Sequence, residues 1–396
     1  MSSNFFLFFI VSLVFLSIGS CSSVTQSPSN QSSAPSPPVL IDHDSLEYLT
    51  TLPNGRVVSM RMFASNPKDM QLERPPQPVS IRYSDDHGLS WSKNDTAFSY
   101  DAGKGVVYGG FVFADKAGNL HCFGVRYFRL ADKEQPGHAI LLHNRSSDAG
   151  KTWTESKQVD FGHSYTGSFN TVTELDNGRI ILALSYTTAY LEERGERDFQ
   201  IVTVHSDDAG DTWQIGSDDI TVPPGEFIGH PGALEPVMIQ LEDARVWMII
   251  RTQQGRFFQS FSSDRGVTWS KTTPTDFEAP NAPGGIIRLD DGRLIFCWND
   301  LSKYAKLTGN QRQYLHVAIS ADDGKTWSSS KQIASIRDGD KPDTNVAYPY
   351  LTTTADKKVL VSYHRVGNRE GVTWWHPIVE VVKIDPDWIA DQRGTE

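Results

Sequence analysis

Cysteine is scarce in this sequence, with three residues in a chain of 396. Cys122 and Cys297 lie in apolar, strand-like sequence, where buried free thiols are the expected state, and no group of cysteines and histidines has the spacing of a zinc site. The sequence therefore argues against a disulfide framework and a structural metal. We expect neither a metal nor an organic cofactor.

Basic residues are also in the minority. The chain has 37 Lys and Arg against 48 Asp and Glu, giving a net charge of −11. Nucleic-acid-binding proteins concentrate positive charge on one face, so we expect no nucleic-acid partner.

Long apolar runs are absent, apart from one of about 14 residues at positions 5–18, which is too short to span a bilayer. Small residues stand directly before Cys21 and resemble a bacterial lipobox, in which Cys21 would become the lipidated first residue, although no Lys or Arg precedes the run. Residues 1–21 are therefore interpreted as a signal peptide with a lipobox, and residues 22–39 as a Ser/Pro-rich tether.

A cell-envelope lipoprotein of the outer membrane or periplasm is expected, with membrane contact only through Cys21. Ordinary secretion is the alternative, and sequons at Asn30, Asn94 and Asn144 leave a secreted eukaryotic glycoprotein open.

A short repeat dominates the rest of the chain. Its pattern is Ser-x-Asp-x-Gly-x-Thr/Ser-Trp. A near-constant period indicates an array of similar units, and each copy has the composition of a β-hairpin turn. The five copies end at Trp91, Trp153, Trp213, Trp269 and Trp327.

A second family of turns, rich in Asn-Gly and Asp-Gly, interleaves with the first and also predicts hairpins. Two hairpins per unit make a four-stranded sheet, which is one propeller blade. We therefore predict an all-β fold, a six-bladed β-propeller over residues 40–396, in which the strand at 378–383 joins the first or last blade. The six turns lie at residues 53–56, 116–119, 176–179, 242–245, 290–293 and 355–358.

Propellers place ligands over the central channel, at the ends of inner strands. Candidate site residues are therefore those that stand beside strand ends and outside the repeat: Arg61 and Asp69 after the first hairpin, Glu235 at the start of a strand, Arg251 at the end of its partner, Arg312 at the start of the strand that leads to the fifth repeat, and Tyr348 at the start of the strand 348–351.

The five repeats resemble the Asp boxes, or BNR repeats, of the sialidase superfamily. That family carries a Glu followed about 15 residues later by an Arg, and Glu235 and Arg251 stand in this relation. It also carries an Arg before the fifth box and a Tyr after it, which correspond to Arg312 and Tyr348. One motif has no counterpart, because Ser45 stands where the family's Phe-Arg-Ile-Pro arginine is expected. Two of the three arginines that grip a carboxylate therefore match.

The resemblance implies an exported, exo-acting retaining glycoside hydrolase that removes a terminal acidic sugar, with sialic acid the first candidate. A sialic acid carries its carboxylate on the anomeric carbon, so a neutral tyrosine avoids the repulsion that an anionic nucleophile would meet. Tyr348 would be the nucleophile, Glu235 its base and Asp69 the acid/base. Arg251 and Arg312 would bind the carboxylate, with Arg61 as a third candidate. We expect the hydroxyl of Tyr348 to lie within about 2.6–3.2 Å of Glu235, and the boxes to lie on turns away from the site.

Two alternatives remain open at this stage. One is a propeller lyase or hydrolase of uronic-acid polysaccharides, for which His163, Tyr165 and His230 are candidates. The other is a glycan-binding lipoprotein without catalysis, in which Tyr348 packs in the core beside Tyr350 and the charged candidates form structural ion pairs. In all three cases the partner is a glycan.

Overall fold

The computed structural model of the chain describes residues 35–62, 73–101, 103–128, 138–163, 172–187, 199–217, 219–225, 232–303, 312–341, 343–367 and 377–391. The signal peptide at residues 1–21 and most of the tether lie outside these residues and stay predictions. Within the described residues, no helix is long and apolar enough to cross a membrane.

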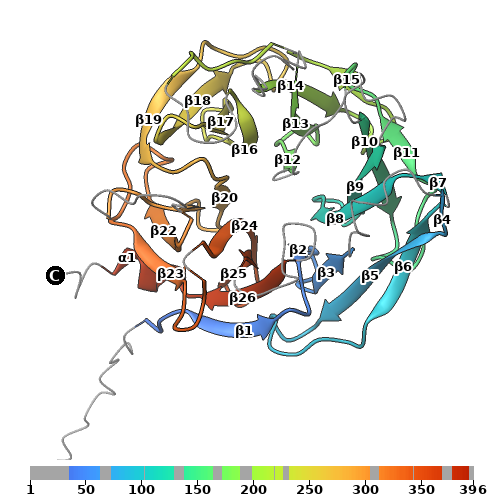
Figure 1. The fold of residues 1–396 in the computed structure, drawn as a ribbon, viewed down its shortest axis with the longest axis horizontal. Coiled ribbons are helices and arrows are strands. Elements are labelled where there is room, and N and C mark those ends of the chain that lie inside the picture. The colour runs from blue at the N-terminus through green and yellow to red at the C-terminus, as the bar shows by residue number, and fades with distance from the viewer. Residues whose placement is uncertain are drawn as a thin grey trace, which may run out of the picture. The chain divides into compact units, whose positions relative to one another are not determined.

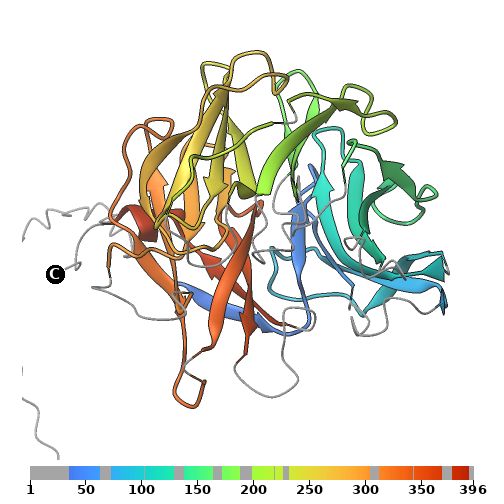
Figure 2. The same cartoon turned by 45° about the horizontal axis from the view of Figure 1, so that its top comes forward.

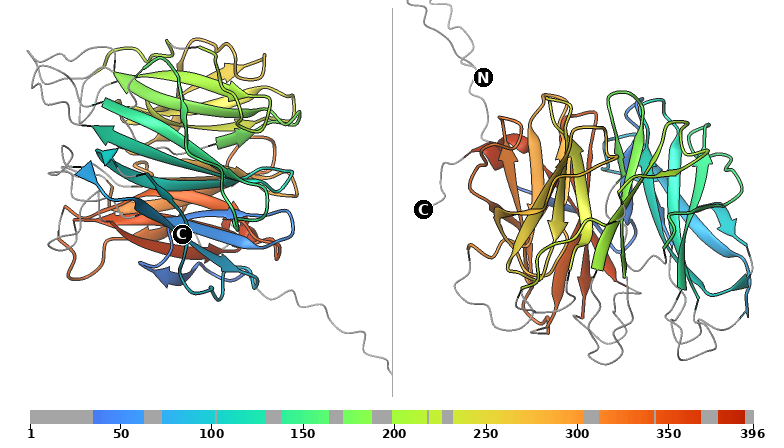
Figure 3. Two further views of the ribbon diagram at one scale, coloured as in Figure 1. Left: turned by 90° about the vertical axis from the view of Figure 1, so that its right-hand side faces the viewer. Right: turned by 90° about the horizontal axis from the view of Figure 1, so that it is seen from above.

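Six four-stranded antiparallel sheets of the described residues stand around a central axis, and this confirms the predicted six-bladed β-propeller (Figure 1). The tilted and side views show the sheets standing along that axis as blades (Figures 2 and 3). Blades 1 to 5 follow one another along the chain. Their strands, from the innermost outward, are β2 Tyr48–Thr51, β3 Val57–Arg61, β5 Gln77–Ser84 and β6 Asp95–Tyr100; β8 Val106–Ala114, β9 Leu120–Phe128, β10 His138–Ser146 and β11 Lys157–Val159; β12 Val172–Glu174, β13 Ile180–Thr187, β14 Phe199–Ser206 and β15 Gln214–Ile215; β16 Leu234–Gln240, β17 Val246–Arg251, β18 Arg256–Ser262 and β19 Thr273–Glu278; β20 Gly285–Arg288, β21 Leu294–Trp298, β22 Tyr314–Ser320 and β23 Lys331–Ser335.

The sixth blade closes the ring. It consists of β24 Asn345–Thr353, β25 Val359–Val366, β26 Ile378–Ile384 and, as its outer strand, β1 Val39–His43 from the other end of the chain. The strand expected at residues 378–383 thus joins the last blade, and β1 covers its edge. This arrangement also explains why the sixth box is missing, because the outer strand comes from the N-terminal side and no hairpin is needed there.

Two minor elements complete the described structure. Strands β4 Glu73–Arg74 and β7 Gly103–Lys104 form a two-stranded sheet, and helix α1 spans Pro386–Ala390.

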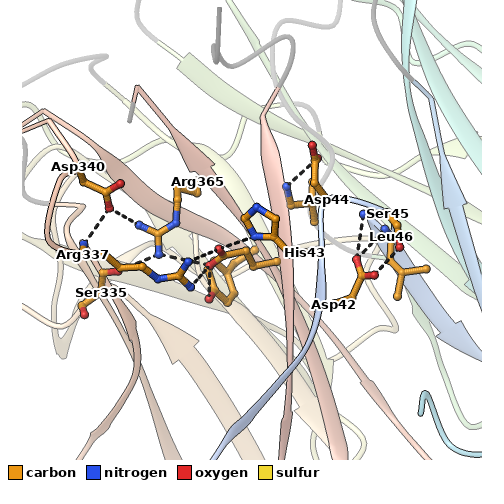
Figure 4. A network of polar contacts seen from close by, with 12 residues as sticks. Asp42, His43, Asp44, Ser45, Leu46, Ser335, Arg337, Asp340 and Arg365 are labelled. Carbon is orange, nitrogen blue, oxygen red and sulfur yellow. Dashed lines mark hydrogen bonds and ion pairs between the residues drawn. The ribbon is translucent and has the colours of Figure 1, made fainter. Parts of the chain in front are cut away.

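A buried ion cluster ties the N-terminal strand β1 to the last blade (Figure 4). Glu380 in β26 is fully buried and accepts hydrogen bonds from Tyr363 Oη at 2.7 Å and Arg337 Nη2 at 2.9 Å. His43 in β1 lies 3.0 Å from the same carboxylate, and Arg365 lies 3.3 Å from it. The last blade is therefore locked to the N-terminal strand by charge as well as by its strand ladder.

The Asp boxes form self-contained turns. In the second box, the Ser146 hydroxyl donates to Asp148 Oδ1 at 2.8 Å and accepts from the Gly150 amide at 2.8 Å. Asp148 also accepts from the Thr152 amide at 2.9 Å, and Trp153 Nε1 donates to the Gly150 carbonyl at 3.1 Å. These boxes join the third and fourth strands of a blade, at the end of the ring where the inner strands finish. The candidate site residues Glu235 and Arg251 stand at the other end, as expected.

Aromatic side chains of the inner strands β2, β8 and β24 pack against one another. Tyr48 packs edge-on against Tyr350 and Phe111, with ring centroids 4.7 and 5.5 Å apart. The same rings line a cavity of about 290 Å³ that continues along the ends of the inner strands. Burial raises the pKa of Tyr48 and Tyr350, so both phenols stay neutral.

Buried histidines form a chain in blade 2, and the His143 ring packs edge-on against Trp213 of the third box. His143 Nε2 lies 3.0 Å from His121 Nδ1, and His121 Nε2 lies 3.2 Å from Asp115. Burial, with the nearby His121, lowers the pKa of His143 to about 3. Burial likewise lowers the pKa of His316 to about 4.

These two histidines predict acid-sensitive folding. Both are neutral in the folded state, whereas in the unfolded chain they take up protons below about pH 6.5. Stability is therefore full above that pH and falls as the pH drops toward 4, with His143 costing on the order of 2–3 kcal/mol by pH 4.5. Calorimetric Tm values between pH 7.5 and 4.5 should show this fall, and His143→Gln should flatten the profile. An identical slope in His143→Gln would mean that other groups cause the acid sensitivity.

Candidate active site

Glu235 and Tyr348 occupy corresponding places in blades 4 and 6. Each precedes a proline, Pro236 or Pro349, in the innermost strand, and the pairing register with the second strand shifts there as in a β-bulge. Both residues have positive φ angles, 36° for Glu235 and 62° for Tyr348. Such a conformation costs on the order of 1–3 kcal/mol in a non-glycine residue and is concentrated at functional sites. Tyr348 was expected to open its strand, but β24 begins at Asn345 and Tyr348 lies at the bulge within it.

The two bulges bring Tyr348 and Glu235 together from residues far apart in sequence. The Tyr348 hydroxyl donates to Glu235 Oε1 at 3.1 Å, which confirms the expected contact. Arg251 Nη1 donates to Glu235 Oε2 and, at 3.2 Å, to the Tyr348 oxygen. The backbone amide of Glu235 donates to Ser185 Oγ at 2.8 Å, so blade 3 supports the bulge. A phenol, a carboxylate and a guanidinium thus form a closed triangle.

Asn281 connects the two predicted clamp arginines. Its Oδ1 accepts from Arg251 Nε at 2.6 Å, and its main-chain carbonyl accepts from Arg312 Nη2. The Arg312 guanidinium lies over the Tyr348 ring, 5.8 Å from its centroid. Arg251 and Arg312 therefore converge on Tyr348.

Burial acts against the charge of both arginines, but their neighbours shift the two pKa values in opposite directions. Burial opposes the charge of Arg251, but Glu235 and Tyr348 outweigh it and raise the pKa of Arg251. Burial lowers the pKa of Arg312, and the positive charge of Arg251 adds to this effect. An anion bound between the two guanidiniums would relieve their mutual repulsion.

On the other side of Tyr348 stands a second ion cluster. Glu47, directly before β2, lies 3.2 Å from His364 Nε2 and 3.6 Å from Arg61 Nε. Arg61 also donates to the carboxylate and the carbonyl of Asp44, both at 2.8 Å. The His364 ring stacks on Tyr348 with centroids 5.8 Å apart. Arg61 is therefore held between two carboxylates, and the His364 ring connects this cluster to Tyr348.

The structure brings together Tyr348, Glu235, Arg251 and Arg312 of the predicted residues. Asp69 lies outside the described residues, and so do Tyr165 and His230. The exposed His163 stacks on Tyr186 with centroids 3.8 Å apart. Among the described residues, no group of three or more His, Cys, Asp or Glu side chains could hold a metal ion.

Sequence reasoning missed Asn281, Glu47 and His364. His364 and Arg251 do share one signal, since each lies six residues after the second-family turn of its blade, Arg251 as the last residue of β17 and His364 two residues before the end of β25. Glu47 precedes the inner strand β2, and Asn281 precedes the inner strand β20. Neither residue belongs to a repeated motif that could have marked it in the sequence.

The fold and this cluster place the chain among sialidase-like β-propellers. In sequence, residues 73–361 match the model of the BNR repeat-like domain. The chain belongs to that family. No curated protein matches it.

Three solved structures illustrate the likeness in fold. A protein of unknown function from Dyadobacter fermentans is 18% identical, with a TM-score of 0.63 over 89% of this chain and 99% of that one. The NanB sialidase of Streptococcus pneumoniae is 16% identical, with a TM-score of 0.61 over 89% and 71%. The intramolecular trans-sialidase of Ruminococcus gnavus is 13% identical, with a TM-score of 0.61 over 89% and 98%. At these identities the likeness concerns the fold, and the chemistry has to be argued from the site.

Proposed function

We propose that the protein is a retaining exo-glycoside hydrolase of the sialidase type that removes a terminal acidic sugar, with sialic acid as the first candidate. The observation that carries the proposal is the 3.1 Å contact between the Tyr348 hydroxyl and Glu235, made from two strained bulges in different blades. Packing alone does not require a buried carboxylate to face a phenol across the channel.

In the first step, the Tyr348 oxygen attacks the anomeric carbon and its proton passes to Glu235. The bond from that carbon to the leaving oxygen breaks, and Asp69 is the residue proposed to protonate the leaving group. A covalent glycosyl-tyrosine results. Arg251, 3.2 Å from the tyrosine oxygen, stabilises the negative charge that develops there.

In the second step, water attacks the same carbon and gives up its proton to Asp69. The bond to Tyr348 breaks, and the phenol recovers its proton from Glu235. Two displacements at one carbon retain its configuration. Atoms and charge balance without a cofactor.

The carboxylate of the sugar would lie between Arg251 and Arg312. Arg61 pairs with Asp44 and Glu47 in a separate cluster, whereas Arg251 and Arg312 both contact Tyr348, which supports a site with two clamp arginines. One charged hydrogen bond contributes roughly 1.5–3 kcal/mol. An acidic sugar should therefore bind about 10- to 150-fold more weakly than in a site with three.

An assay with paired substrates tests the proposal. A fluorogenic sialoside should be hydrolysed, and ¹H NMR of the first product should show the anomer of retained configuration. Uronic-acid polymers are assayed in parallel. Cleavage of these alone, with an unsaturated ultraviolet-absorbing product, would indicate a lyase instead. Glycan binding without turnover of either substrate would indicate a binding protein.

A further inference from the structure

Asn281 stands on a loop that is built to be rigid. The loop joins β19 to β20, and Asn281 is its one half-exposed residue, flanked by the buried pairs Ala279–Pro280 and Ala282–Pro283. The two prolines fix their own φ angles. The Ala279 amide donates to the Gly255 carbonyl at 3.0 Å, which ties the loop to a hairpin of blade 4.

From this loop, one residue bonds two guanidiniums through different atoms. The side-chain oxygen of Asn281 accepts from Arg251 Nε, and its carbonyl oxygen accepts from Arg312 Nη2. A guanidinium is planar with donors in fixed directions, so one bond to Nε sets the plane of the whole group. Two arginines that repel each other are thus kept in fixed orientations before any ligand arrives.

We propose that Asn281 is the positioning residue of the carboxylate clamp and that it sets selectivity for acidic over neutral sugars without needing to touch the substrate. The inference rests on the proposed function, because it assumes that Arg251 and Arg312 bind the carboxylate. Binding to a preorganised pair of arginines avoids the entropy cost of ordering them. The side-chain amide therefore affects ligands that carry the charge and has little effect on those that do not.

Binding of N-acetylneuraminic acid and of its methyl ester, followed by NMR titration of the full chain, tests this inference. The reference protein should prefer the acid. Asn281→Ala removes the bond to Arg251 and keeps the main-chain bond to Arg312, so we expect about tenfold weaker binding of the acid and a change within about twofold for the ester. Asn345→Ala is the matched control. Asn345 opens β24 at the same end of the ring, and its side-chain amide donates to the Asp343 main-chain carbonyl.

The outcomes separate the inference from the proposed function. If Asn281→Ala weakens the acid and the ester alike, the residue is only structural and the inference is wrong. If Asn281→Ala prefers the acid over the ester as strongly as the reference protein does, the inference is again wrong, but the proposal of an acidic substrate is unaffected. If the reference protein does not prefer the acid, the acidic substrate and this inference both fail, whereas hydrolysis of a neutral glycoside that Tyr348→Phe abolishes would still support the tyrosine mechanism.

Discussion

Tyr348→Phe should abolish turnover while leaving the protein folded. The substitution removes the one oxygen that would attack the anomeric carbon, and loss of a nucleophile lowers kcat by at least about 10³-fold. The ring remains, so its stacking on His364 and its contact with Arg312 are kept. Glu235 loses one hydrogen bond but keeps its contact with Arg251. The lost hydrogen bond should lower the free energy of unfolding by about 1 kcal/mol. Steady-state kinetics and a calorimetric Tm measure the two quantities together.

Tyr350→Phe is the matched control for this prediction. Tyr350 lies two residues along the same strand, where it is 5% exposed and packs against Tyr48 and Phe111. Its hydroxyl faces the aromatic core of the channel, so turnover should stay within about threefold of the reference value. Full activity in Tyr348→Phe would remove the sialidase-type mechanism and favour a lyase or a binding protein.

The blades could be predicted because each copy of the repeat marks one hairpin turn of a blade. Each box fixes its own turn through contacts among residues four apart, such as Asp148 with Thr152. Such local hydrogen bonding depends on the motif alone. The closing strand β1 could not be placed in this way, because its partner β26 lies at the other end of the chain and no local pattern connects them.

The site was predicted in part for a similar reason. Glu235, Arg251, Arg312 and Tyr348 match family motifs and do converge. The bulges were not foreseen, since they appear in the sequence only as a proline after each key residue, Pro236 and Pro349. The fate of Arg61 could not be foreseen either, because its neutralisation by Glu47 and Asp44 depends on how the ring closes.

Glu380→Gln should have the largest effect on stability. Glu380 is fully buried and binds Tyr363 and Arg365 of β25, Arg337 of the connection from β23 to β24, and His43 of β1. The substitution keeps the volume but removes the charge and turns an amide group toward donors. Removing one partner from a buried charged cluster costs about 3–5 kcal/mol. For a chain of this length the Tm should fall by about 4–7 °C.

The effect should be specific to the buried cluster and to ring closure. Asp243 forms a half-exposed pair with Arg245, so Asp243→Asn should leave the Tm nearly unchanged. Burial opposes the charge of Glu380, but Tyr363, Arg365 and Arg337 outweigh it and lower its pKa. Its carboxylate therefore stabilises the fold above the unfolded pKa of about 4.3, and this contribution is lost as the pH falls through the folded value. The Tm difference between Glu380→Gln and the reference protein should accordingly shrink in acid.

Since His43 belongs to β1, limited proteolysis at pH 7 should also cut near β1 sooner in Glu380→Gln. A Tm difference that stays constant down to pH 3, or cutting near β1 at an unchanged rate, would mean that the strand ladder alone closes the ring.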